Sequence, residues 1–115
     1  MKNVNNSLPP KTNTLDKLVT KPADIEKVVN GQKVATRRSG RFADVGEKWV
    51  LQDRTFIVKD VYRQKLGEVT DVDAVKEGYQ NIEDYKASIL SLHPGMKWLP
   101  EMKVWVHEFE AVENN

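Results

Sequence analysis

The last apolar segment of the chain, residues 103–112, constrains the fold more than any other, because it is apolar on two faces. In a strand, side chains alternate between faces, so Val104 and Val106 share one face while Trp105 and Phe109 share the other. A strand of this kind is covered on both sides in the folded protein. This requirement fits a small curved sheet or barrel with helices packed against its outside.

Three further segments have the composition of β-strands: one begins near Val34, and the others cover residues 47–52 and 55–66. The last of them is long, and its apolar phase shifts between Val58 and Val61. Such a shift indicates a bulge or bend near Asp60. We therefore expect a twisted, mostly antiparallel barrel of about five or six strands.

Three segments carry helix signals. Residues 22–29 begin with proline, hold acids in their first turns and stop before Gly31. The segment after Thr70 has a cap followed by acids and stops at Gly78. Asn81 caps a third segment, in which apolar side chains recur at three- and four-residue spacing until His93. The predicted class is α+β, a small barrel flanked by helices.

At 115 residues the chain is long enough for a single domain, which we place at residues 14–113. Residues 1–13 are rich in Asn, Lys and Pro and are predicted to form a flexible tail. Leu15, Leu18 and Val19 then suit a short helical turn that docks onto the domain. The chain has no signal-peptide core and no run near the roughly 18 apolar residues of a membrane helix, so we expect a cytoplasmic protein without membrane contact, and a monomer.

Charge is distributed unevenly along the chain, although the formal net charge is only +1. No acidic residue lies between Val28 and Phe42, a stretch with four basic residues, Lys33, Arg37, Arg38 and Arg41. Residues 67–85 instead hold six acids against one base. The small net charge argues against a protein that coats nucleic acid, and two facing patches of opposite sign suit a cleft.

The basic segment brings a lysine, a hydroxyl and guanidinium groups close together. If a strand begins at Val34, its period puts Thr36 and Arg38 on one face and Arg37 on the other. Lys33 falls in the preceding turn, where its flexible stem can reach the side of Thr36. We therefore predict a cluster of Lys33, Thr36 and Arg38 that binds an anionic or strongly polar ligand.

The order of these elements resembles the ASCH domain, a branch of the PUA-like superfamily. The matching sequences are GQKVATRR, GEKWVLQ, FIVKDVYRQKLGEVTDVDAVKEGY and KVWVHEF, which together cover about residues 22–112. The resemblance implies a small β-barrel flanked by helices, with a polar cluster at its mouth. It also implies RNA-linked binding or, in one bacterial branch, hydrolysis of the amide of N(4)-acetylcytidine.

In that hydrolytic branch a lysine, a threonine and a glutamate form the active constellation, and these match Lys33, Thr36 and Glu77. The implied roles are a nucleophilic hydroxyl at Thr36, an amine at Lys33 that activates it or acts as a base, and proton delivery by Glu77. The family arginine matches Arg38, whose fork of donors would hold an oxygen. The alternative is that Lys33 and Glu77 form a structural ion pair while Thr36 fills a strand position. Either way, we expect Lys33 and Glu77 within ion-pair reach at the barrel mouth.

Four more residues are candidate ligand-binding groups. Arg37 and Arg41 either bind phosphate or belong to a solvated loop. Trp98, in a loop flanked by proline and glycine, offers a surface for base stacking, whereas the other two tryptophans lie in predicted strands and are expected in the core. Tyr79 follows Glu77 and Gly78 and either lines the pocket or packs a helix against the barrel.

We predict no metal site and no cofactor, because His93 and His107 stand alone and the chain has neither cysteine nor a phosphate-binding loop. Two functions stay open: binding of RNA or a modified nucleoside, and amide hydrolysis of an acylated cytidine. The short basic patch favours a small ligand or a few nucleotides over a long duplex. We expect binding first, with hydrolysis as the alternative.

Overall fold

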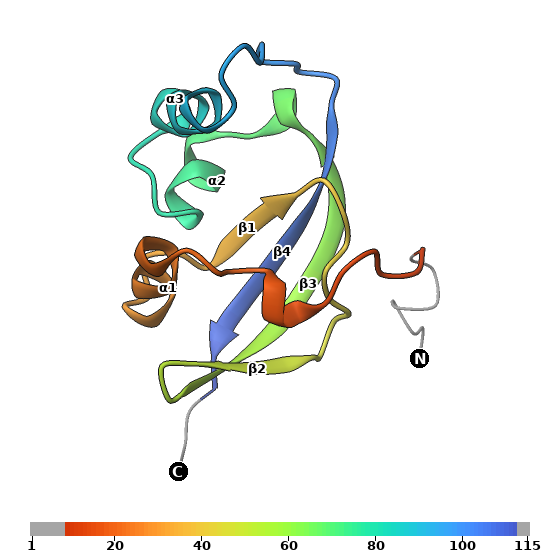
Figure 1. Cartoon of the computed structure of the whole chain (residues 1–115), viewed down its shortest axis with the longest axis vertical. Coiled ribbons are helices and arrows are strands. Elements are labelled where there is room, and N and C mark those ends of the chain that lie inside the picture. Colours follow the sequence, from red (N-terminus) through yellow and green to blue (C-terminus); the bar gives the residue numbers. More distant parts are fainter. Residues whose placement is uncertain (1–8, 113–115) are drawn as a thin grey trace.

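The fold is built on one antiparallel sheet of four strands, in a computed structural model that describes residues 9–112. The strands lie in the order β1-β4-β3-β2 (Figure 1). Their bounds are Ala35–Arg38 for β1, Lys48–Leu51 for β2, Arg54–Lys65 for β3 and Lys103–Ala111 for β4. The expected α+β class with an antiparallel, curled sheet is confirmed. The number of strands is four within the described residues instead of five or six, because β1 and β2 form the two edges and leave the barrel half open.

The long pairing of β3 with β4 contains the expected bulge. Val58 lies opposite Phe109 and Asp60 lies opposite Glu108, so one residue, Lys59, has no partner across the strands. The bulge restores the apolar phase, because Val58 and Val61 are three residues apart and are both buried in the same core.

Three α-helices surround the sheet: α1 (Pro22–Val29), α2 (Asp71–Lys76) and α3 (Ile82–Leu92). Short 3-10 turns, η2 (Leu15–Lys17) and η3 (Leu66–Glu68), precede α1 and follow β3. The predicted caps form, since the side chains of Thr70 and Asn81 accept from the third amide of α2 and α3. Helices α2 and α3 lie next to each other near one end of the sheet (Figure 1), and their shared core contains Ala74 and Tyr85.

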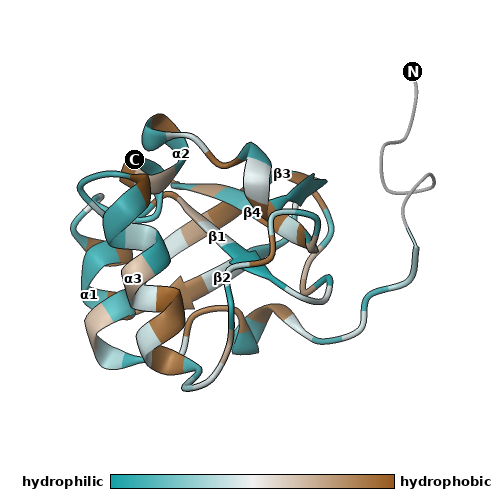
Figure 2. Cartoon of the chain, turned by 90° about the horizontal axis from the view of Figure 1, so that it is seen from above, coloured by the Kyte–Doolittle hydropathy of each residue, from teal (hydrophilic) through white to brown (hydrophobic). Residues whose placement is uncertain are grey.

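The main core lies on the other face of the sheet, beneath η2. The predicted docking turn is confirmed, because Leu15, Leu18 and Val19 are at most 6% exposed and pack against strand residues such as Phe109. Trp49 packs edge-on against Phe109 with ring centroids 5.3 Å apart. Apolar and hydrophilic segments alternate along α3 in Figure 2, as expected for a helix with one covered side.

Residues 9–13, which belong to the predicted tail, lie against the loop between β1 and β2. Arg41 Nε donates to the Pro9 carbonyl over 2.7 Å, and the Thr12 amide donates to the Arg41 carbonyl over 2.9 Å. Lys11 pairs with Glu47 at 3.0 Å. Residues 1–8 and residue 113 of the predicted tail and domain lie outside the described residues. No helix within residues 9–112 is long and apolar enough to cross a membrane.

Candidate functional site

Lys33 and Glu77 meet in a buried ion pair, as expected. Lys33 lies in the turn between α1 and β1, and Glu77 caps the C-terminal end of α2. Both are 4% exposed, and Lys33 Nζ lies 3.4 Å from Glu77 Oε1 and donates to the Glu77 carbonyl over 3.1 Å. Burial lowers the pKa of Lys33, and the nearby charge of Glu77 only partly opposes this effect.

Arg37 is the second cation of this cluster. Its Nη1 donates to Glu77 Oε2 over 2.6 Å and its Nε donates to Gln64 Oε1 over 2.9 Å. Its Nη2 lies 3.7 Å from a carboxylate oxygen of Asp73 in the first turn of α2. Two buried cations therefore face two carboxylates, which offsets the cost of burying each charge.

Thr36 and Arg38 do not join this cluster. The sequence correctly predicts that Thr36 and Arg38 lie on one face of β1 and Arg37 on the other. The face that carries Arg37 is the one directed toward Glu77. Arg38 Nη2 donates to the Leu18 carbonyl, beside η2, and among the described residues the Thr36 hydroxyl makes no hydrogen bond to the cluster. The predicted grouping of Lys33, Thr36, Arg38 and Glu77 is corrected in this respect, because α2 covers the face of β1 that carries Arg37.

His107 lies opposite Thr36 on β4 and is fully buried. Its Nε2 accepts a hydrogen bond from the Phe42 amide over 3.0 Å. Burial lowers the pKa of His107 to about 4, with the charge of Arg38 acting in the same direction. The ring is therefore neutral at physiological pH. Residues 9–112 contain no group of three His, Cys, Asp or Glu side chains that could hold a metal ion.

A cavity of about 500 Å³ lies between the end of β1, helix α3 and the start of β4. We call it the α3 cavity; its lining residues are Lys21, Arg37, Arg38, Ser39, Leu66, Tyr85, Ile89, Leu92, His93, Met96, Met102 and Val104. Arg37 connects it to the buried cluster, because the same guanidinium holds Glu77.

The α3 cavity is chemically two-sided. One side is basic, with Lys21, Arg37 and Arg38, and the other is an apolar wall contributed mainly by α3 and the segment before β4. Its lining contains no carboxylate. Tyr85 is a buried residue of the lining. Burial, followed by the charge of Glu77, raises the pKa of its phenol, so the phenol stays neutral and can only take part as a hydroxyl. Such a space suits a flat or apolar group that carries negative charge.

The other predicted ligand-binding residues lie elsewhere. Arg41 is 4% exposed and donates to the carbonyls of Pro9 and Ala43, besides its pairing with Asp44, so burial removes it from any ligand surface. The Tyr79 hydroxyl bonds Ser88 of α3 over 3.1 Å, and Tyr79 also lines a second cavity, of about 490 Å³, together with Lys27 and Gly78.

Trp98 is half-buried against α3. Its ring lies 6.2 Å from that of Tyr85 and 5.1 Å from the amine of Lys86. It does not line the α3 cavity. The buried part of its ring packs against the small core between α2 and α3. Base stacking on its exposed part stays a prediction.

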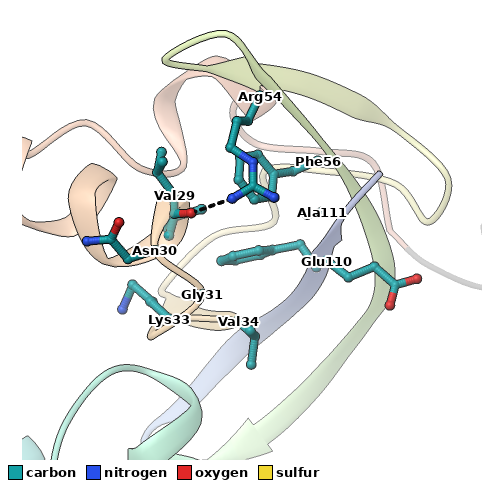
Figure 3. A pocket seen from close by; sticks show the side chains of 11 residues that line it. Val29, Asn30, Gly31, Lys33, Val34, Arg54, Phe56, Glu110 and Ala111 are labelled. Carbon is teal, nitrogen blue, oxygen red and sulfur yellow. Dashed lines mark hydrogen bonds between the residues drawn. The ribbon is translucent and has the colours of Figure 1, made fainter. Parts of the chain in front are cut away.

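A smaller cavity of about 110 Å³ lies at the C-terminal end of α1 (Figure 3). There Arg54 Nη1 donates to the Val29 carbonyl over 2.8 Å, which satisfies one of the free carbonyls at the helix end. The Lys33 amine points away from Arg54 in this view, toward the Glu77 side. The chemistry of Lys33 therefore belongs to the buried cluster and not to this cavity.

Several residues of the α3 cavity were not predicted from the sequence. Ile89 and Leu92 do belong to the apolar stripe of α3, but the stripe indicates packing and gives no sign of a cavity. Lys21 and Ser39 belong to no motif, and Tyr85 reads as an ordinary core residue. Only the tertiary arrangement brings them together.

A curled four-stranded antiparallel sheet flanked by three helices is the fold of an ASCH domain. A crystal structure of an ASCH domain from Lactobacillus crispatus JV V101 matches it with a TM-score of 0.64 and 13% identity, over 77% of this chain and 70% of that one. A protein of Enterococcus faecalis V583, assigned to the family DUF984, matches with a TM-score of 0.54 and 18% identity, over 76% of this chain and 66% of that one. At these identities the likeness concerns the fold, and the chain spans about two thirds of each of the two structures. The sequence itself matches no family model and no curated protein.

Proposed function

We propose that this domain binds RNA or a modified nucleoside in the α3 cavity. The observation that carries the proposal is the two-sided lining, with Lys21, Arg37 and Arg38 facing an apolar wall and no carboxylate among them. A nucleotide has the matching halves, since its base is flat and largely apolar while its phosphate is anionic. The fold match to an ASCH domain agrees with this proposal.

The size of the site limits the ligand. A volume of about 500 Å³ accommodates a nucleoside or a few atoms more, but not a duplex. The net charge of +1 likewise gives little general attraction for long nucleic acid. A single nucleoside, or one unstacked nucleotide of a single strand, is therefore the ligand that we propose.

The proposal can be tested with fluorescence anisotropy of a short, labelled single-stranded RNA. Leu92 lines the cavity and is 52% exposed, so Leu92→Asp adds a negative charge at the mouth without emptying the core. We expect RNA binding to weaken by about tenfold or more, because the new carboxylate repels phosphate. Val50→Asp is the matched control, since Val50 is a 61% exposed valine on β2. Equal affinity of both variants and the unmodified chain would remove the cavity from consideration.

Amide hydrolysis of an acylated cytidine is the second candidate, and Lys33 is the reason to keep it. A buried lysine with a lowered pKa, 3.4 Å from a carboxylate, can act as a base. In this proposal water adds to the amide carbon, the carbon–nitrogen bond breaks, and the products are a carboxylate and the free amine of cytidine. Glu77 would pass a proton to that amine. Thr36 lies on the opposite face of β1, so water is a better-placed nucleophile than its hydroxyl.

Incubation with N(4)-acetylcytidine separates these possibilities. If the enzyme proposal holds, Lys33→Met abolishes release of cytidine and Thr36→Val leaves it nearly intact, with folding checked by circular dichroism. Loss of turnover in Thr36→Val would restore the threonine as nucleophile. If the unmodified protein binds RNA but shows no turnover, hydrolysis is excluded and binding remains as the proposed function.

A further inference from the structure

We propose that the mouth of the α3 cavity holds a phosphate subsite formed by Lys21, Arg38 and Ser39. This inference rests on the proposed function and narrows its ligand to a phosphorylated nucleotide or a nucleotide within a strand, rather than a free nucleoside. The three residues line the same cavity, two at the end of β1 and one just before α1.

Arg38 carries donors that the described part of the chain does not use. Its Nη2 donates to the Leu18 carbonyl, while Nε and Nη1 donate to no group within residues 9–112. Of these two atoms, Nε is fully buried, whereas Nη1 keeps accessible surface in the described part of the chain. An unused guanidinium donor that keeps accessible surface at the lining of a cavity is available to an acceptor oxygen of a ligand.

The Arg38 guanidinium is also held in place before any ligand arrives. The bond to Leu18 fixes one end, and the ring of Phe42 lies 5.8 Å from its central carbon. A preorganised guanidinium loses little conformational entropy when it binds an oxyanion. By contrast, the charge of Arg37 is already taken up by Glu77 and Asp73.

Lys21 and Ser39 add the remaining elements of a phosphate site. Lys21 is exposed and forms no ion pair among the described residues, so its charge is available at the cavity mouth. The exposed Ser39 supplies a hydroxyl beside Arg38. Two cations and a hydroxyl, with no carboxylate in the lining, recognise an oxyanion such as a phosphate monoester or diester.

The test compares N(4)-acetylcytidine with its 5′-monophosphate by isothermal titration calorimetry, with the labelled RNA as a third ligand. We expect the monophosphate to bind at least about tenfold more tightly than the nucleoside, as a charge-assisted contact implies. Lys21→Gln should remove most of this difference, because the monophosphate then loses one of its two cationic partners. Lys48→Gln is the matched control, because Lys48 is an exposed lysine on β2 and does not line the cavity. Arg38→Gln tests the contribution of the guanidinium to phosphate binding. If loss of the bond to Leu18 unfolds Arg38→Gln, the comparison of Lys21→Gln with its control still tests the subsite.

The outcomes separate the two proposals. Equal affinity for nucleoside and monophosphate, or a Lys21→Gln effect no larger than that of Lys48→Gln, overturns the phosphate subsite while RNA binding stands. Absence of binding for all three ligands overturns the proposed function and the subsite with it. Preference for the monophosphate that disappears in Lys21→Gln supports both.

Discussion

Lys33 and Arg37 share one carboxylate, and this arrangement makes Glu77 the most consequential residue of the site. Removing the charge of Glu77 leaves both cations buried, and the more distant Asp73 is then the remaining carboxylate beside Arg37. We expect Glu77→Gln to lower the free energy of unfolding by about 3–5 kcal/mol in chemical denaturation. Glu83→Gln, which breaks only a surface pair with Lys86 on α3, should change it little. A Glu77→Gln protein as stable as the control would contradict the buried network.

His107 gives the stability of the protein a defined dependence on pH. The unfolded chain binds a proton at this residue near pH 6.5, whereas the folded chain does so only near pH 4. Between these values the unfolded state holds more protons, so the free energy of unfolding falls as pH decreases, by about 3 kcal/mol in total. This stabilisation is fully present above pH 6.5. Denaturant titrations from pH 7 to 4 should show the loss in the unmodified chain and in His93→Gln, and a smaller slope in His107→Gln.

At the scale of single residues, the sequence predicts which side chains pair but not which face of a strand a helix covers. The two-residue period of β1 separates Arg37 from Thr36 and Arg38, and the resemblance selects Lys33 and Glu77, which do form an ion pair. Period alone cannot say which face of an edge strand a helix will cover. The assignment of Arg37, and not Arg38, to the cluster therefore needed the tertiary placement of α2, and only the structure supplies that.

Among the elements, α2 matters most, because it is short and yet positions Glu77 at its end. Gly78 ends it with φ of +90°, a backbone conformation that other residues adopt at a cost. A Cβ at this position would also lie 3.0 Å from Lys27 Cδ. We expect Gly78→Ala to cost about 1–2 kcal/mol of stability and to weaken ligand binding as well.

Gly46→Ala is the control for Gly78→Ala, because Gly46 precedes β2 and does not line the α3 cavity. It has a similar φ of +95° but open space around the added methyl group. Its stability should fall by a comparable amount with ligand binding unchanged, as measured by anisotropy. If both variants bind RNA equally well, the end of α2 does not position the site.

The elements themselves were largely predictable, because their signals are local. Pro22 and Gly31 flank α1, Thr70 and Asn81 cap the next two helices, and the phase shift in β3 marks its bulge. The number of strands was overestimated, since barrel closure depends on contacts between distant segments. The α3 cavity was not predicted for the same reason, because its lining residues come from five separate parts of the chain.

At the level of the whole molecule, residues 9–13 join the N-terminal segment to the loop after β1. A Cβ on Gly40 would lie 2.2 Å from Thr12 Oγ1, which accepts from the Arg41 amide. We expect Gly40→Ala to lower the free energy of unfolding by about 1–3 kcal/mol, because the added methyl group would overpack this contact. In a Thr12→Ala background the same change should cost less, since the obstructing hydroxyl is gone. Purely additive effects in this double-mutant cycle would mean that the two segments are not in contact.

We expect binding of the proposed ligand to be coupled to proton uptake by Lys33, which shares a carboxylate with Arg37. Because the pKa of Lys33 is lowered, its amine is partly neutral at alkaline pH, where a surface lysine would still be charged. The charge of Arg38 is one of the causes that lower the pKa of Lys33, so a phosphate bound to Arg38 offsets that charge and raises the proton affinity of the amine. Binding heats measured at alkaline pH should therefore vary with the ionisation enthalpy of the buffer, and Lys33→Met should abolish this variation. The cavity would then act as a proton-linked receptor, whose affinity for anions declines as the solution becomes more basic.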